Sequence, residues 1–412
     1  MVRIIAVALV CAACGPARFD RRIREYVRLA VALGERDPDS MDFYYGPPEW
    51  VDGIRKNPPS LEEIRRGARN LDGDLKNDRY PRAVRLATQT RAIAARAEEL
   101  LGWKKTFEQE ATVYFGLAIP EFDADRLKET RAQLDGLLSG RGSLADRYAA
   151  FDQQFLVPSD RLAAVMARAI QGCREQTRQH LRLPAGEGVT VEYVHDKPWS
   201  AFSHYQGNFR SVIQVNADLR LTVDRVLQLA CHEAYPGHHA YNVIQDIQFV
   251  RDGHWPEWTV QPAFSPQSLV SEALATYAAD VTFPEPERLR FERDALFPLA
   301  GLDPKDAERY DRVERLVEEL HSAEPAIARE YLDGKLEWAR AAAALEEQVL
   351  MAHPEEALKY ISEYRSYMIT YTLGRDLAAK LIHGWPKFEQ LMTDPNAAEI
   401  FREAASRSMM KP

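Results

Sequence analysis

The stretch CHEAYPGHH (residues 231–239) decides the fold that we expect, because it carries dense metal-ligand chemistry. It places three histidines and one glutamate within eight residues. The apolar positions of residues 223–230 recur at helical spacing, so we expect His232 and Glu233 to lie on a buried helix. A neutral imidazole is a good zinc ligand, and a neighbouring carboxylate can act as general base toward a zinc-activated water. The stretch therefore predicts a zinc site with Glu233 as the catalytic base.

The spacing of these histidines departs from the H-E-x-x-H signature, in which two histidines stand four residues apart on one helix face. Here Pro236 occupies the fourth position after His232, and the next histidines stand six and seven residues after it. Proline removes a helical hydrogen bond and glycine relaxes the backbone, so a two-residue insertion can bring His238 to the second ligand position. His239 would need a third inserted residue and is the rival ligand. If His239 is not a ligand, we expect it to contact substrate or to be a buried histidine with satisfied ring nitrogens.

Glu272 is the expected third ligand. It lies in an expected helix over residues 266–281, with apolar neighbours at positions 269, 270, 273 and 274. A carboxylate in such a setting is costly to bury without a partner, and a metal would be that partner. The alternative is a glutamate on the solvent-facing side of the helix.

Three short motifs resemble those of one known family. HEAYPGHH (residues 232–239) resembles the H-E-x-x-P-G-H-H signature of a large bacterial domain-of-unknown-function family. SEALATYA (271–278) is similar to its E-G-W-A-x-Y segment, with Ala-Leu in place of Gly-Trp, and ITYTLG (369–374) is similar to its C-terminal Y-x-x-G segment. Members of that family are often lipoproteins and are grouped with gluzincin-like zinc metallopeptidases, which are mostly helical and use a glutamate as third ligand. The resemblance implies the same fold and the same kind of site here.

Four further side chains receive roles at this site. Tyr371, on the C-terminal motif, is expected to donate a hydrogen bond to the developing oxyanion. His239, Tyr235 and Tyr277 are expected to contact substrate. Tyr371 also belongs to a stripe of tyrosines at helical spacing, and the alternative for such a stripe is core packing.

The rest of the chain predicts a mainly α fold. Residues 61–183 and 303–381 are helical in pattern. The convincing strand signals are two short β-branched runs at residues 190–195 and 211–216. We therefore expect a large helical body with a small β-hairpin or sheet next to the zinc-binding helix.

The expected helical body has no repeat or low-complexity linker that would mark a domain boundary. We expect residues 14–412 to form a single metallopeptidase-like domain, in which residues 14–183 make a helical wall and residues 184–412 the metal-site half. The run at 211–216 is either an edge strand along which a peptide pairs or part of a structural hairpin.

The N-terminus has the pattern of a secretory signal. A short basic head is followed by apolar residues 4–10, and small residues precede Cys14. We expect residues 1–13 to be a signal peptide of lipoprotein type and Cys14 to be the lipidated first residue of the mature protein. Secretion without a lipid is the alternative. The expected location is extracytoplasmic, in the bacterial cell envelope.

Cysteine usage predicts little covalent stabilisation. Apart from Cys11 and Cys14 in the expected signal, the chain contains Cys173 and Cys231. Two cysteines do not indicate a disulfide framework, so we expect stability to come from packing.

Charge and hydropathy limit the classes of partner. The formal net charge of −9 argues against nucleic acid or an anionic membrane surface. The sequence has no apolar run of roughly 18 residues, the length that a membrane-spanning helix needs. We therefore expect contact with a membrane only through the lipid anchor.

These observations predict a zinc-dependent hydrolase, most simply a metallopeptidase with Zn2+ as cofactor and a peptide as substrate. One alternative is an envelope lipoprotein that binds a peptide or a cell-envelope component with a structural metal and no catalysis. Another is a zinc hydrolase of a non-peptide amide or ester. Three protein ligands with an open position favour catalysis, whereas four ligands, including His239, favour a structural metal.

Overall fold

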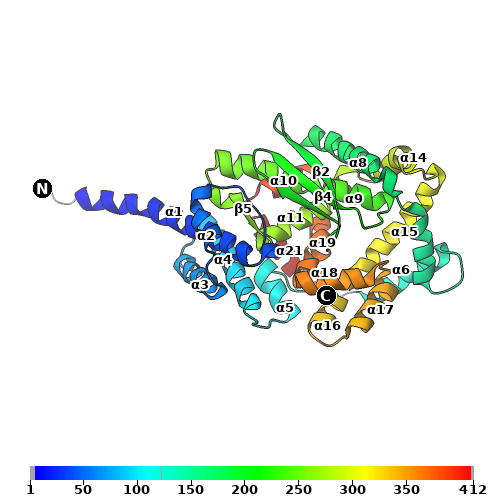
Figure 1. The fold of residues 1–412 in the computed structure, drawn as a ribbon, viewed down its shortest axis with the longest axis horizontal. Coiled ribbons are helices and arrows are strands. Elements are labelled where there is room, and N and C mark those ends of the chain that lie inside the picture. The colour runs from blue at the N-terminus through cyan, green and yellow to red at the C-terminus, as the bar shows by residue number, and fades with distance from the viewer. Residues whose placement is uncertain (1–4, 122, 410–412) are drawn as a thin grey trace. The chain divides into compact units, whose positions relative to one another are not determined.

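A computed structural model describes residues 5–121 and 123–409 (Figure 1). Helices dominate these residues and the strands form two small sheets, which confirms the mainly α fold. Within the described part of the chain, every helix is too short or too polar to cross a membrane. Residues 1–4 and the side chains of residues 5–18 lie outside the description, and with them the predicted signal peptide and the lipidated Cys14.

Internal contacts divide the chain into two compact units, each made of segments that are separate in sequence. The first comprises the chain up to Lys104, Val113–Phe115 and Gln245–Ser268. The second comprises Lys105–Thr112, Gly116–Ile244 and the chain from Leu269 onward. Every residue expected in the metal site belongs to the second unit. Most of residues 105–183 also belong to this unit, although we expected them in the helical wall with residues 14–104.

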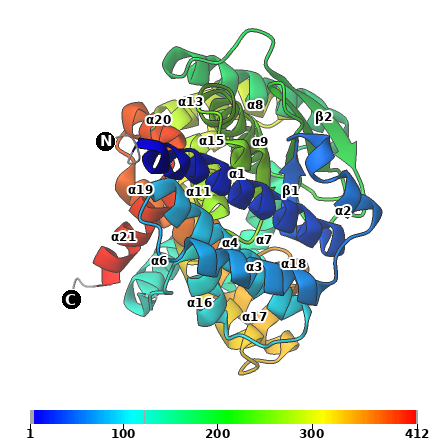
Figure 2. The ribbon, with the colours of Figure 1, turned by 90° about the vertical axis from the view of Figure 1, so that its left-hand side faces the viewer.

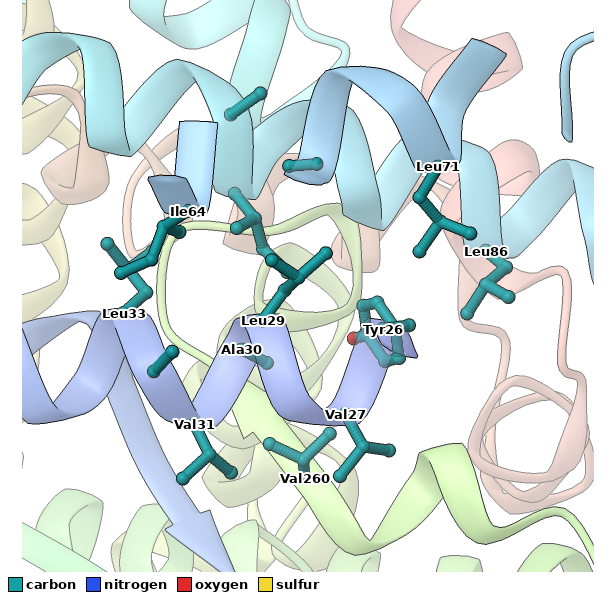
Figure 3. Packing of buried hydrophobic residues seen from close by; sticks show 14 of the residues in the cluster. Tyr26, Val27, Leu29, Ala30, Val31, Leu33, Ile64, Leu71, Leu86 and Val260 are labelled. Carbon is teal, nitrogen blue, oxygen red and sulfur yellow. The ribbon is translucent and has the colours of Figure 1, made fainter. Parts of the chain in front are cut away.

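The first unit is built on packed helices and a two-stranded antiparallel sheet. Its elements are α1 (Ile5–Arg36), β1 (Met41–Tyr44), α2 (Asp52–Lys56), α3 (Leu61–Leu75), α4 (Pro81–Leu100) and β5 (Val260–Pro262). Helix α1 runs beside α3 and α4 (Figure 2). Leu29 and Leu33 of α1 face Ile64 of α3, while Val27 lies toward Val260 (Figure 3). Apolar residues at helical spacing thus give α1 a buried face that holds this unit together.

The second unit contains a three-stranded sheet and most of the helices. Its strands are β2 (Gly188–Val194), β3 (Ala201–Tyr205) and β4 (Arg210–Asn216). Its helices up to the metal-site region are α5 (Phe107–Glu110), α6 (Ala124–Leu137), α7 (Leu144–Asp152), α8 (Ser159–His180), α9 (Val223–Glu233) and α10 (His238–Gln245). The later helices are α11 (Pro266–Thr276), α12 (Ala278–Thr282), α13 (Glu287–Phe291), α14 (Phe297–Ala300), α15 (Ala307–Leu320), α16 (Glu324–Leu332), α17 (Trp338–Val349), α18 (Pro354–Tyr364), α19 (Leu373–Leu381), α20 (Trp385–Thr393) and α21 (Ala397–Met409).

The three-stranded sheet has the order β2-β4-β3, with β4 in the centre. Strand β2 pairs parallel with β4, and β3 pairs antiparallel with it. The two predicted strands are therefore confirmed, but they do not form a hairpin with each other; β3, which the sequence pattern did not predict, forms the hairpin with β4. The hypothesis that residues 211–216 offer a free edge to a peptide is wrong, because both edges of β4 are already hydrogen-bonded to neighbouring strands.

A disulfide joins Cys173 of α8 to Cys231 of α9, with 5.6 Å between the two Cα atoms. Helices α8 and α9 lie side by side in the second unit (Figure 1). The bridge corrects the expectation that packing alone stabilises the protein. A single bridge across 58 residues leaves no recognisable spacing in the sequence. Because Cys231 directly precedes His232, the bond ties the metal-site end of α9 to α8.

Removing this bridge should lower the free energy of unfolding by about 2–4 kcal/mol, because a closed loop restricts the unfolded chain. The test compares urea denaturation of the wild type and of the Cys173→Ser/Cys231→Ser double variant, each with and without a reductant. We expect the reductant to destabilise the wild type to the level of the variant and to leave the variant unchanged. Equal stability of the two proteins without reductant would contradict this role of the bridge.

Candidate metal centre

The metal-site helix is interrupted where the sequence predicts an insertion. Helix α9 ends at Glu233, and α10 begins at His238. Across the connection, the N–H of Gly237 donates to the carbonyl of Cys231 at 3.0 Å, and the N–H of Ala240 donates to the carbonyl of Ala234 at 3.1 Å. Both hydrogen bonds span six residues, two more than in a regular α-helix. The connection therefore accommodates the two extra residues that separate this motif from H-E-x-x-H.

Gly237 is required by the closeness of this turn. A Cβ atom at this position would lie 1.9 Å from the carbonyl oxygen of His232 and 2.5 Å from that of Cys231. Backbone atoms cannot move aside as a flexible side chain can, so only glycine fits here. The turn directs the chain back so that His238 and His232 approach each other, with ring centroids 4.7 Å apart and ring planes at 87°.

Three side chains bring one potential ligand atom each to a common point: His232, His238 and Glu272, all within 4.8 Å of one another. The Nε2 atoms of His232 and His238 lie 3.3 and 3.4 Å from the Glu272 oxygens. Tetrahedral ligands at zinc–ligand distances of about 2.0–2.1 Å are themselves about 3.3–3.4 Å apart. Charge-assisted hydrogen bonds are shorter, about 2.7–2.9 Å. The contacts of His232 with Oε2 and of His238 with Oε1 are therefore longer than charge-assisted hydrogen bonds, and both match the spacing of neighbouring zinc ligands.

The Glu272 carboxylate is buried on α11 and only partly satisfied by protein groups. Its Oε1 accepts a hydrogen bond of 2.9 Å from the hydroxyl of Tyr367, whereas its Oε2 has no hydrogen-bond partner among the described residues. Burial alone would raise the pKa of Glu272, but the imidazoles of His238 and His232 lower it below its ordinary value. The nearest side-chain nitrogen to Oε2 is the Nε2 of His232, at 3.3 Å, and it makes no hydrogen bond that meets normal geometry, so a bound cation would satisfy this buried oxygen better.

Ser271 orients His238, one of the three potential ligands. The Nδ1 atom of His238 shares a 3.1 Å hydrogen bond with the hydroxyl of Ser271, which turns Nε2 toward Glu272.

Glu233, the last residue of α9, is buried, and its Oε2 has no hydrogen-bond partner in the described chain. Burial raises the pKa of Glu233, while His232 and His238 partly oppose the shift. A carboxylate with a raised pKa beside a metal site is suited to accept and release a proton.

Tyr371 reaches the site because α19 packs closely against α11. A Cβ atom at Gly374 would lie 3.2 Å from the Cβ of Ala273, so a larger residue would push the two helices apart. The ring of Tyr371 lies 6.1 Å from that of His232, and its oxygen accepts a 3.2 Å hydrogen bond from Tyr360. That bond leaves the hydrogen of the Tyr371 hydroxyl free to be donated. Burial, followed by the charge of Glu272, raises the pKa of Tyr371 well above its ordinary value, so the hydroxyl stays protonated.

His239 lies away from the three potential ligands, in a buried network. Its Nδ1 shares a 2.8 Å hydrogen bond with the hydroxyl of Ser211 on β4, and its Nε2 lies 3.0 Å from an oxygen of Glu187. The same Glu187 oxygen accepts a 2.6 Å hydrogen bond from Tyr235. Burial lowers the pKa of His239, which keeps its imidazole neutral near pH 7. These contacts differ from the expected substrate contacts of His239 and Tyr235, because their polar atoms are already bonded inside the protein.

Tyr277, also expected to contact substrate, follows α11 directly and is half-buried. Burial raises the pKa of Tyr277. The charge of Asp280 adds to this rise, and the charge of Arg375 opposes it.

Three contributors to the site were not identified from the sequence. Tyr367 belongs to the same stripe of tyrosines as Tyr371, and its position one helical turn before Tyr371 is a signal that could have marked it. Ser271 directly precedes Glu272, and a hydroxyl beside a ligand is a recognisable signal. Glu187 lies in a loop 52 residues before His239, and nothing in the local pattern marks it.

Comparisons with known proteins inform the fold. No family model and no curated protein matches the chain. Among solved structures, a candidate lipoprotein from Colwellia psychrerythraea is similar, with a TM-score of 0.50 and 14% sequence identity. The similarity covers 88% of this chain and 69% of that protein. At this identity it shows a shared fold, and the family resemblance seen in the motifs stays a prediction.

The two adjacent histidines should respond differently to substitution. His238→Ala should lose zinc, because it removes one of the three ligand atoms. His239→Ala should keep zinc and instead lower the free energy of unfolding by about 1–3 kcal/mol, since Glu187 and Ser211 each lose a buried partner. Elemental analysis and urea denaturation of both variants measure the difference. Loss of zinc from a folded His239→Ala variant would place His239 among the ligands.

Proposed function

We propose that the protein is a zinc-dependent hydrolase of metallopeptidase type. His232, His238 and Glu272 would hold the metal, and Glu233 would act as the general base. The observation that carries the proposal is the convergence of His232, His238 and Glu272, whose potential ligand atoms lie within 4.8 Å of one another, beside the buried Glu233, whose Oε2 has no hydrogen-bond partner among the described residues.

The number of ligands supports catalysis over a structural metal. A structural zinc site is closed by four protein ligands, whereas a catalytic site keeps one position open. His239 is the residue that would close this site, and both of its ring nitrogens are engaged by Ser211 and Glu187. Three ligands therefore remain within the described chain, which favours an open fourth position.

When bound, zinc would polarise the scissile carbonyl and make water acidic enough to attack near neutral pH. Glu233 would accept a proton from the attacking water and later deliver it to the leaving amine. Its raised pKa, caused by burial, helps the carboxyl to hold that proton between the two steps. The Tyr371 hydroxyl would donate a hydrogen bond to the oxyanion that develops on the carbonyl oxygen.

The substitution Glu233→Gln separates metal binding from turnover. The amide keeps the shape of the side chain and removes the base, so zinc content should stay at the wild-type level while kcat falls by roughly 10²- to 10⁴-fold. Glu355→Gln, an exposed position on α18, is the matched control and should leave both quantities unchanged. The measurement is cleavage of a mixed-peptide pool, with zinc quantified in each preparation. Wild-type turnover by the Glu233→Gln variant would falsify this assignment.

The location that we propose is the cell envelope, with a lipid anchor at Cys14. The N-terminal sequence supports it, as does the description of the Colwellia psychrerythraea protein as a candidate lipoprotein. The Cys173–Cys231 disulfide also suits an oxidising compartment.

Cell fractionation tests this location. We expect the wild type in the membrane fraction and the Cys14→Ser variant in the soluble fraction, because the variant lacks the thiol that carries the lipid. Mass spectrometry of the wild type should show the added mass of the acyl chains at the mature N-terminus. A wild-type protein found entirely in the soluble fraction would rule out the anchor.

A further inference from the structure

A small polar cavity opens beside one of the proposed ligands. His232 lines it together with Arg225 of the same helix and with Asp280, Arg288, Glu318 and Arg375. Its volume is about 40 Å³, and one water molecule needs roughly 10–15 Å³. The space therefore admits a group as small as a carboxylate, and it lies wholly within the second unit.

The charges around this cavity do not balance. Three arginines line it against two carboxylates. Arg375 is paired with both carboxylates, at 2.9 Å to Asp280 and 2.8 Å to Glu318. Arg288 is paired with Glu292 at 3.1 Å and lies 3.8 Å from Asp280. These two arginines are therefore already neutralised by protein groups.

Arg225 is the exception among the three. Its guanidinium hydrogen-bonds the neutral side chain of Gln228 at 3.2 Å, and within the described residues no carboxylate oxygen lies within 4.0 Å of it. The surrounding protein desolvates the group enough to lower its pKa, yet the side chain stays accessible to solvent. Both observations fit a cation on the wall of a concave opening. Such a cation is available for an anion that enters from outside.

The position of Arg225 relates this cation to the proposed chemistry. It precedes His232 by seven residues on α9, two helical turns along the same face. The charges of Asp224, Glu233 and Glu318 act on it, so Arg225 lies in the field of the proposed base. An anionic group held by Arg225 would thus belong to a substrate whose scissile bond lies at the metal centre.

We propose that Arg225 binds the C-terminal carboxylate of a peptide substrate, so that the protein releases residues from the C-terminal end. The inference rests on the proposed hydrolase function and specifies its substrate class. Guanidinium groups pair with carboxylates in a two-pronged geometry that an ammonium cannot reproduce. In the reaction, the water oxygen adds to the carbonyl carbon and the carbon–nitrogen bond breaks. One water proton passes through Glu233 to the leaving amine, and the remaining hydroxyl stays on the new carboxylic acid.

Binding of defined peptides tests the inference without relying on turnover. The probes are tetraalanine as the free acid, tetraalanine as the C-terminal amide, and an amidated tetrapeptide that ends in glutamate. Each is titrated by calorimetry into the zinc-loaded Glu233→Gln variant, with and without Arg225→Gln. We expect the free acid to bind about 10- to 100-fold more tightly than the amide, and Arg225→Gln to abolish that difference. Arg220→Gln, an exposed position outside the cavity, is the matched control and should preserve it.

Turnover gives the second readout. In the otherwise wild-type protein, Arg225→Gln should raise KM for the free acid and leave zinc content unchanged, and Arg225→Lys should recover only part of the loss. Equal binding of acid and amide, or a preference that survives Arg225→Gln, would overturn the inference and leave the hydrolase proposal standing. Tight binding of the glutamate amide would assign Arg225 to an acidic side chain, which also overturns it. Selective binding of the free acid by a protein that hydrolyses none of these peptides would support the inference and contradict the hydrolase proposal.

Discussion

Burial of the Glu272 carboxylate is the constraint around which the second unit is arranged. A charged carboxylate removed from water is costly unless donors or cations surround it. The protein supplies His232 from the end of α9, His238 from the start of α10 and the hydroxyl of Tyr367. These partners come from separate parts of the chain, so the carboxylate fixes where those parts meet. Even so, one of its oxygens has no hydrogen-bond partner among the described residues, which is why the arrangement suits a cation better than a closed network of protein groups.

The turn between α9 and α10 places the neighbouring histidines His238 and His239 in contact with different residues. Successive residues of a helix point about 100° apart, so His238 and His239 face different surroundings at the start of α10. The first faces Glu272, and the second faces Glu187. Helix α8 restrains both sides of the turn: its Cys173 is bonded to Cys231 before the turn, and its Arg174 forms an ion pair of 2.6 Å with Glu187, which holds His239 after it. The positions of the proposed ligands are thus supported by a helix that supplies none of them.

Local patterns in the sequence predicted the parts of the site that depend on spacing and on hydropathy. The two extra residues of the motif pointed to an interrupted helix, and the apolar neighbours of Glu272 pointed to a buried carboxylate; the structure shows both features. The mainly α fold followed from long helical periodicities in the same way. Such signals are local, because each depends on residues that are close together in the sequence.

The features that were missed depend on partners that are distant in sequence. The free-edge hypothesis for β4 failed because strand order is set by pairing with β2 and β3, which periodicity within one strand does not encode. The disulfide joins residues 58 positions apart, and Glu187 meets His239 across 52. His239 could not be placed beforehand, because its role depends on Ser211 and Glu187 and not on its own neighbours.

The close turn at Gly237 has a consequence for recognising distant relatives of this chain. The forbidden contact is between a side-chain carbon and the backbone oxygens of residues 231 and 232, so it exists whatever the metal, substrate or reaction. A chain that reads H-E-x-x-P-x-H with any other residue at the sixth place cannot close this turn, however similar it is elsewhere. Conversely, a relative that has changed its ligands and lost its chemistry would still need this glycine to keep the fold. The glycine therefore indicates the fold, and the histidines indicate the proposed metal site. A search pattern that scores them separately would distinguish relatives that have lost the proposed site from unrelated chains.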